Sequence, residues 1–210
     1  MKKEKLIRFN QQNILDAAQK LFVQKGVRQT TMDDIAKAAD YSKSTIYVYF
    51  KSKEEIYYYI IYEHMCRLKD MTLDCVEKSG TFEDCYYEIC SGLVNYYEQY
   101  PLYFVSIMGN ISVDEQDLRE SEILRQIYNV GEEINDIMAG LFEKGMKENY
   151  LRKGVDILPA VFTLWASLGS LITMAYEKEA YLLKRMHMDR TAFLRYGFQL
   201  LLDSVKNRER

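Results

Sequence analysis

The chain has 210 residues, of which 48% are hydrophobic and 28% charged, a composition typical of a globular protein. Two prolines and ten glycines are too few for a turn-rich β protein, so a mostly helical chain is expected. The formal net charge is −3, but residues 1–51 hold 10 Lys and Arg against 5 Asp and Glu, whereas the remainder holds 18 against 26. The basic N-terminal quarter indicates either a surface for a polyanion or a solvated basic tail.

Several classes of protein are disfavoured by missing motifs. The N-terminal MKKEKLIRFNQQN has no apolar stretch of signal-peptide length, so a cytoplasmic location is expected. The four cysteines lack C-x-x-C spacing and are expected to be reduced, buried thiols. Neither His64 nor His187 has a metal ligand at helical spacing, so neither a metal site nor a cofactor is expected. No G-x-S-x-G, Gly-rich phosphate loop or H-E-x-x-H occurs, and no catalytic residue is assigned.

The first predicted helix ends at Gly26, a usual residue just beyond a helix C-terminus. Its apolar residues follow the spacing of one helical face: Ile14, Ala17, Ala18, Leu21 and Phe22. A second, short helix is predicted to begin after Thr31, which forms a T-x-x-D variant of the capping box with Asp34.

A tight turn at Asp40 is predicted to follow, because aspartate tolerates the left-handed backbone that such a turn needs. Ser42 can cap a third helix running to Phe50. On that helix Ile46 and Phe50 face one way, while hydroxyl groups and a lysine point largely elsewhere. Residues 31–50 therefore predict a helix-turn-helix whose second helix lies against DNA, the alternative being a helical hairpin with a polar face.

Residues 10–56 resemble the DNA-binding domain of the TetR family of bacterial transcriptional regulators. The segments ILDAAQKLFVQKG and TTMDDIAKAADYSKSTIYVYFKSKEEI carry the resemblance, which covers about a quarter of the chain. The positions in register with the family pattern are Ile35, Ala36, Ala39, Ser42, Ile46, Tyr47, Tyr49, Phe50, Lys53 and Ile56. The resemblance implies an all-α protein with a three-helix DNA-binding domain at 1–52 and a helical ligand-binding and dimerisation domain at 53–210.

The resemblance also implies roles for individual residues. Lys43, Ser44, Thr45 and Tyr49 would face bases in the major groove. Thr31, Tyr47, Val48 and Lys53 occupy positions that contact the phosphate backbone, and Arg28 is added by its charge alone. Val48 cannot donate a hydrogen bond, which makes its phosphate role doubtful.

Three residues depart from the family pattern. Asp40 replaces a glycine in the turn, Tyr41 replaces a valine, and Ser44 replaces a common glycine. These departures keep open a regulator of the same fold that acts through a protein partner and has a weakened DNA-binding head. The operator sequence cannot be borrowed from relatives.

Beyond the motif, Ser52 and Glu55 can cap a long helix from Lys53 to about Lys78. Further helices are expected from Thr81 to about Tyr100, over 102–108, 118–149 and 158–179, and over 190–207; 110–117 is expected to be turn-like. Glycines inside 118–149 indicate that this helix is bent or interrupted.

The uncharged stretch at 157–176 is as long as a membrane span, but it contains hydroxyl residues and has acidic flanks. A helix that is apolar on every face also suits a bundle buried on two sides, which is the interpretation favoured here. In the TetR family the last two large helices form a four-helix bundle between subunits. The residues assigned to that dimer interface are Leu164, Leu168, Leu171, Phe193 and Leu201.

A ligand pocket is expected chiefly from the resemblance. Its candidate lining residues are Phe104, Met108, Phe142, Met146 and Trp165, although residues of these types more often form a core. The acidic balance of the region favours a neutral or cationic effector. The predicted function is a DNA-binding regulator, a repressor that binds a palindromic operator as a homodimer and is released by an unidentified small-molecule effector, with no membrane partner. An all-helical enzyme is the less favoured alternative.

Overall fold

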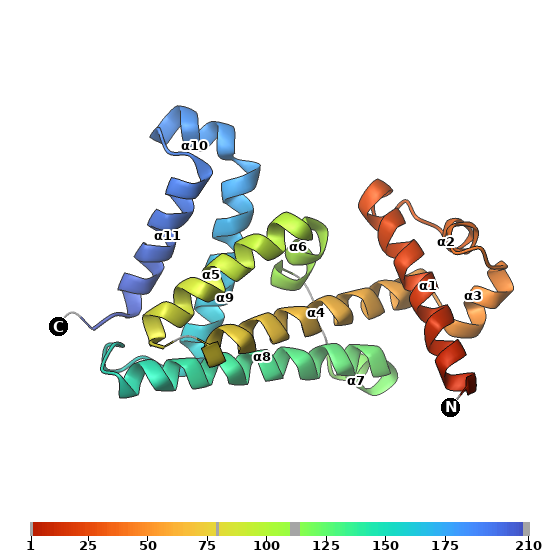
Figure 1. Ribbon diagram of the computed structural model, residues 1–210, viewed down its shortest axis with the longest axis horizontal. Helices are drawn as coiled ribbons and strands as arrows, with labels where there is room; N and C mark the ends of the chain where they lie inside the picture. Colours follow the sequence, from red (N-terminus) through yellow and green to blue (C-terminus); the bar gives the residue numbers. More distant parts are fainter. Residues whose placement is uncertain (1, 79, 110–113, 208–210) are drawn as a thin grey trace. The chain divides into compact units, whose positions relative to one another are not determined.

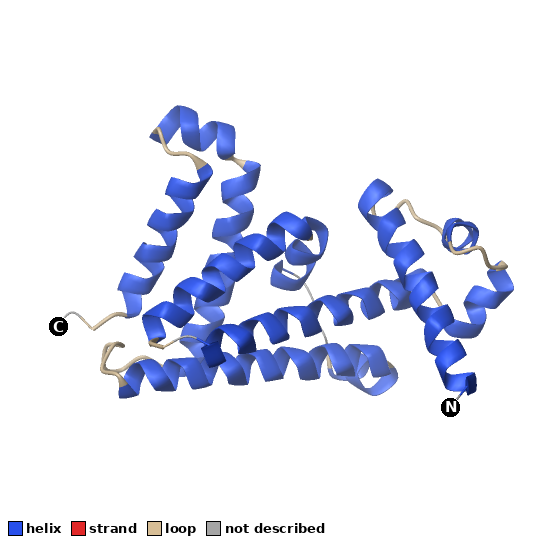
Figure 2. Ribbon diagram, viewed as in Figure 1, coloured by secondary structure: helices blue, strands red, loops and turns tan. Residues whose placement is uncertain are grey.

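The computed structural model describes residues 2–78, 80–109 and 114–207, and it is built from helices (Figures 1 and 2). Within these residues no strand occurs, apart from one isolated bridge between Leu151 and Lys206. Contacts divide the chain into two compact units, residues 1–64 with 113–128 and residues 65–112 with 129–210. The all-α class predicted from the sequence is confirmed. The division at residue 52, which follows the motif, stays a prediction.

The first unit contains the predicted helix-turn-helix. Its helices are α1 (Lys2–Lys25), α2 (Met32–Ala38), α3 (Lys43–Tyr49), the start of α4 (Lys53–Lys78), α7 (Glu115–Glu120) and the start of α8 (Glu122–Lys147). Helix α2 packs against both α1 and α3. The core is formed by apolar side chains with almost no solvent exposure: Ile14, Ala18, Phe22, Ile35, Ile46, Phe50, Ile56 and Ile60.

The predicted helix ends are confirmed. Gly26 follows α1 with a φ of 83°, and Thr31 and Asp34 form the full capping box of α2. Ser42 caps α3 by accepting from the Thr45 amide. These signals are readable from sequence because each joins a side chain to backbone no more than four residues away.

Asp40 adopts the predicted left-handed conformation, with a φ of 59°. The Asp40 amide donates to the Lys37 carbonyl over 3.3 Å, and the Tyr41 amide donates to the Ala36 carbonyl over 2.9 Å. This pair of bonds is a Schellman motif, which ends α2 and turns the chain into α3. Aspartate therefore replaces glycine without changing the form of the turn.

The second unit contains α5 (Phe82–Gln99), α6 (Pro101–Gly109), α9 (Ile157–Glu177), α10 (Glu179–Met186) and α11 (Arg190–Val205), together with the remaining parts of α4 and α8. Helix α9 packs against α5, α6, α10 and α11, and in Figure 1 it runs beside α11 as one arm of a hairpin closed by α10. Close approach on α9 occurs at Gly169, where an added Cβ would lie 2.9 Å from the Met108 Cβ.

Three expectations about helices need correction. Residues 115–117 were expected to be turn-like but begin α7, because Asp114 and Asp117 form a capping box; residues 110–113 lie outside the described residues. The long helix after 118 is interrupted at Ser121, which has an extended backbone, and runs unbroken through its glycines. A separate helix, α10, follows Lys178.

Helix α9 is less buried in the single chain than the sequence suggested. One face packs inward through Val161, Leu164, Leu168, Gly169, Ile172 and Ala175. Its opposite face leaves Phe162 58% and Met174 50% exposed. Among the described residues, α9 is the one helix with the length and composition of a membrane span, which by itself is weak evidence for a membrane.

Candidate nucleic-acid interface

Helix α3 separates a buried side from an exposed side. Ile46 and the cap residue Phe50 are buried, as predicted. On the other side Val48 is 78% and Tyr47 49% exposed, and Lys43 and Ser44 are also exposed. A short helix with this division can lay its exposed side in the major groove of DNA.

The first turn of α3 carries three linked hydroxyl groups. The Ser42 Oγ accepts from the Thr45 amide over 3.1 Å and lies 2.7 Å from the Thr45 Oγ1 and 2.8 Å from the Ser44 Oγ. Hydroxyl groups both donate and accept, so this group can meet either phosphate oxygens or base edges. Ser44 and Thr45 were both predicted to face bases, and the structure brings them together.

Lys43 does not extend freely into solvent. Its Nζ lies 3.0 Å from a carboxylate oxygen of Asp33 on α2, and this hydrogen-bonded ion pair raises the pKa of Lys43 above its usual value. Both side chains are more than half exposed. Lys43 must therefore exchange Asp33 for a DNA acceptor if it is to read a base.

Tyr49 is linked to α1 by its hydroxyl group, a contact that sequence reasoning missed. Asn10 Nδ2 donates to the Tyr49 Oη over 2.8 Å, and Asn10 Oδ1 accepts from the Tyr41 Oη over 2.9 Å. Tyr41, which replaces the valine of the family pattern, thus has a hydrogen-bond partner on another helix for its hydroxyl group. No local pattern signals this contact, because 31 and 39 residues separate the partners.

Of the predicted phosphate contacts, Tyr47 and Val48 lie on α3, whereas Arg28, Thr31 and Lys53 lie around α2 and the start of α4. The Thr31 Oγ1 donates to Asp34 over 2.7 Å, and Lys25 donates to the same carboxylate over 2.7 Å. The bonds from Lys25 and Thr31 hold the pKa of Asp34 well below its usual value. Lys53 Nζ donates to the Arg28 carbonyl over 3.4 Å, which links these two basic residues.

Comparison with known proteins gives a family for this arrangement. The family model described as bacterial regulatory proteins, tetR family, matches residues 14–60, which include α2, α3 and the turn between them. Residues 14–60 of this chain therefore resemble the DNA-binding domain of the TetR family. The relatives of the chain include HTH-type transcriptional regulators of Bacillus subtilis and Staphylococcus aureus.

Relatives and solved structures extend the TetR comparison to the whole chain. YhgD of Bacillus subtilis, an uncharacterised transcriptional regulator, is 30% identical over 107 residues, which are 51% of this chain and 56% of YhgD. The fatty acid degradation regulator FadR from Bacillus halodurans is 22% identical with a TM-score of 0.70, covering 95% of this chain and 97% of that one. FadR from Bacillus subtilis in complex with stearoyl-CoA has 18% identity and a TM-score of 0.65, with coverages of 92% and 98%. The chain therefore shares the fold of both structures.

Three of the five residues predicted for the TetR-type ligand pocket, Phe104, Phe142 and Met146, differ in their surroundings. Phe104 is fully buried against Tyr97, with ring centroids 5.2 Å apart. Phe142 packs against Phe82, with ring centroids 5.6 Å apart, and Met146 is 36% exposed. The ligand role of these residues stays a prediction, because dense packing is also what a core requires.

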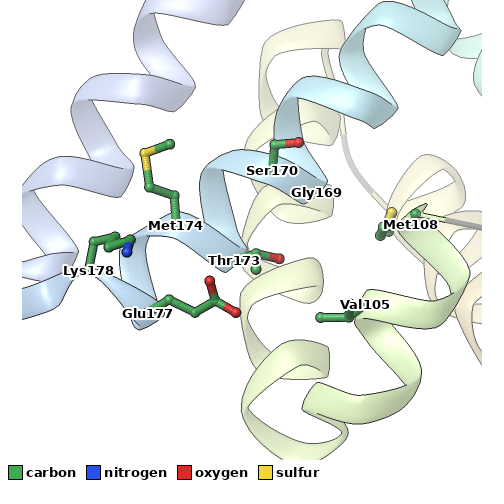
Figure 3. A pocket seen from close by; sticks show the side chains of 9 residues that line it. Val105, Met108, Gly169, Ser170, Thr173, Met174, Glu177 and Lys178 are labelled. Atoms are coloured by element: carbon green, nitrogen blue, oxygen red, sulfur yellow. The ribbon is translucent and has the colours of Figure 1, made fainter.

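Met108 does line a cavity, of about 310 Å³, between α6 and α9 (Figure 3). Helix α6 lines one side of this cavity with Val105, Met108 and Gly109. The second half of α9 and its cap residue line the other side, with Gly169, Ser170, Thr173, Met174, Glu177 and Lys178. Trp165 lies one helical turn before Gly169, and its buried indole N–H has no hydrogen-bond partner among the described residues. The cavity is largely apolar, with an acid and a base close together at one end.

The residues predicted for the TetR-type dimer interface lie in different environments. Leu164 and Leu168 are buried in the chain's own core, with exposures of 4% and 1%, and their interface role stays a prediction. Leu171 contacts Gly197 of α11, and Phe193 and Leu201 are half-buried. The exposed apolar residues of these helices are Leu158, Phe162, Met174, Tyr196 and Leu200.

Proposed function

We propose that this chain is a cytoplasmic repressor that binds a palindromic operator as a homodimer and is released by a small-molecule effector. The observation that carries the DNA-binding part is the exposed side of α3, where a lysine and linked hydroxyl groups stand on a helix fixed by a cap and two buried residues. Two copies related by two-fold symmetry would place two such helices on a palindromic site.

The dimer is supported by the exposed apolar face of α9 and α11, defined by Leu158, Phe162, Met174, Tyr196 and Leu200. Large apolar side chains exposed on neighbouring helices such as α9 and α11 are suited to burial in an interface. A second copy covering this face would also supply the second set of partners that an uncharged helix such as α9 needs.

The effector class is suggested by the similar FadR structure that holds stearoyl-CoA. A long acyl chain suits the apolar walls of the α6–α9 cavity, and Lys178 offers a cation near its end. The acidic balance of the region instead favours a neutral or cationic ligand. Stearoyl-CoA and an apolar cation of similar length are therefore the two probes to compare.

The DNA-binding proposal is tested with duplexes selected from random DNA by the wild-type protein. Lys53→Ala removes a phosphate contact, so binding should weaken equally on all sequences and the salt slope should fall by about one unit. Thr45→Ala should instead relax preference at particular base pairs, by roughly 1–3 kcal/mol for a good contact. Both are measured by fluorescence anisotropy at several salt concentrations.

Two outcomes would contradict the proposal. Equal losses on selected and random DNA from Thr45→Ala would remove its base-reading role. A wild-type protein that shows no salt-dependent binding to any selected duplex would favour the regulator that acts through a protein partner.

A further inference from the structure

Asn10 of α1 joins two tyrosines at opposite ends of α3. Tyr41 precedes the cap residue of α3, and Tyr49 is the last residue of that helix. The Tyr41 hydroxyl donates to Asn10 Oδ1, and Asn10 Nδ2 donates to the Tyr49 hydroxyl oxygen. All three side chains are half-buried, so the network lies at the edge of the core and within reach of solvent.

The direction of these bonds decides what the Tyr49 hydroxyl can still do. A phenol has one proton to donate and an oxygen that accepts. Because Tyr49 accepts from Asn10, its proton is not used in that bond, and no other acceptor for it occurs among the described residues. Successive hydrogen bonds polarise one another, so the Asn10 amide makes Tyr49 a stronger donor towards an acceptor outside the chain.

We propose that Asn10 is a positioning residue for DNA recognition, which holds Tyr49 so that its hydroxyl proton is donated to an acceptor on duplex DNA. This inference rests on the proposed function, because it requires α3 to dock on DNA. The acceptor is a phosphate oxygen or a base atom such as guanine O6 or N7 or thymine O4. Tyr41 acts through the amide: by occupying the carbonyl oxygen, it leaves the NH₂ group facing Tyr49.

The decisive variant is Asn10→Asp, which keeps the side-chain shape but offers acceptors alone. Tyr49 would then turn its proton to the carboxylate, and the DNA would lose its donor. In the wild-type background Tyr49→Phe is expected to weaken binding roughly five- to tenfold, the value of one hydrogen bond. In the Asn10→Asp background it is expected to have no further effect. The added negative charge is present in both proteins of the Asn10→Asp background, with and without Tyr49→Phe, so it cancels in this comparison.

Modified duplexes identify the acceptor. If it is a phosphate oxygen, replacing that phosphate by a neutral methylphosphonate abolishes the effect of Tyr49→Phe, whereas base changes do not. If it is a base atom, changing that base pair abolishes the effect. Either result supports the inference, and an effect that survives every phosphate and base substitution overturns it.

A purely structural role for Asn10 is separated by thermal unfolding and a matched control. Gln12→Leu removes an amide of the same helix whose partner is Asp16, and it is expected to leave the Tyr49→Phe effect unchanged. If the wild-type protein binds no duplex, the proposed function fails. If it binds and Tyr49→Phe costs as much with Asn10→Asp as without it, this inference fails and the proposed function stands.

Discussion

Lys43 has two possible partners, an acid of its own chain and the DNA. In the free protein its ammonium group lies 3.0 Å from Asp33, at a site where both side chains are largely in water. Ion pairs in such a position are weak, because solvent and salt screen them. Asp33 therefore acts less as a support for the fold than as a competitor for the lysine that is predicted to read a base.

Removing that competitor should strengthen DNA binding. Asp33→Asn frees Lys43 and removes one negative charge beside the duplex, so affinity should rise and the salt dependence should steepen by about one unit. Binding to a selected duplex, measured at salt concentrations from about 50 to about 200 mM, checks this. Asp16→Asn on α1 is the matched control, because Asp16 is paired with Gln12 of its own helix. Unchanged or weaker binding by Asp33→Asn would show that Lys43 does not reach the DNA.

Helix α2 has seven residues, too few to be stable without its ends and its packing. The Asp34 carboxylate accepts from the Thr31 amide and hydroxyl and from Lys25, so one acid holds the start of α2 and links it to the end of α1. The lowered pKa of Asp34 measures how strongly these donors favour the charged form. The position of α2, and with it that of α3, depends on this charge.

The stability of this element should depend on pH. A carboxyl whose pKa is lowered by folding stabilises the folded state above its unfolded pKa of about 3.9, and the contribution is lost as the pH falls through the lowered folded value. Asp34→Asn should therefore lower the unfolding temperature at pH 7, and the difference from the wild type should shrink below about pH 4. Circular dichroism melts across this range measure it. If the difference in unfolding temperature between the wild type and Asp34→Asn stays constant at every pH tested below 4, the charge of Asp34 is not its cause.

The short-range elements of this fold could be predicted from the sequence, whereas contacts between distant residues could not. Gly26, Thr31 and Ser42 act within one turn of their own positions, so their residue types alone fix the helix ends. The pairing of Asn10 with Tyr41 and Tyr49 joins separate helices, and residue spacing carries no trace of it. The rotation of α9 about its axis could not be predicted from the sequence either, because a helix that is apolar on every side does not reveal which side packs inward. In the structure Leu164 and Leu168 are buried, whereas Phe162 is exposed.

At the scale of the whole molecule, the exposed face of α9 and α11 should decide the oligomeric state. Phe162→Glu or Leu200→Glu places a charge on residues that are each 58% exposed, so the monomer should fold normally while association is lost. Operator binding should weaken because two linked heads bind more tightly than one. Ultracentrifugation at micromolar concentration gives the molecular mass.

A suitable control is Leu73→Glu on α4, which is 38% exposed and lies outside that face. It should stay as associated as the wild type. The prediction is wrong if the wild-type protein sediments as a folded monomer. It is also wrong if the Glu variants sediment like an associated wild-type protein, because this face would then not form the interface.

An effector must obey a reciprocal relation with DNA. If stearoyl-CoA or an apolar cation weakens operator binding 10- to 100-fold, about 1.4–2.8 kcal/mol of coupling, then operator DNA must weaken that ligand by the same factor. Trp165, the single tryptophan, lies one turn from the α6–α9 cavity and supplies a fluorescence signal for the titration. A ligand that binds equally well with and without operator is not an inducer. If Trp165→Ala leaves an inducer's affinity unchanged, Trp165 is not part of its binding site.

Gly197 limits which substitutions can occur between α9 and α11. An added Cβ there would lie 2.5 Å from Leu171 Cδ2, so α11 leaves no room for a side chain at this position while Leu171 keeps its present conformation. Gly197 is itself buried, and a substitution to alanine would require the Leu171 side chain to turn away from α11. A larger residue at position 197 would therefore favour a smaller residue at position 171, so the two positions are expected to vary together.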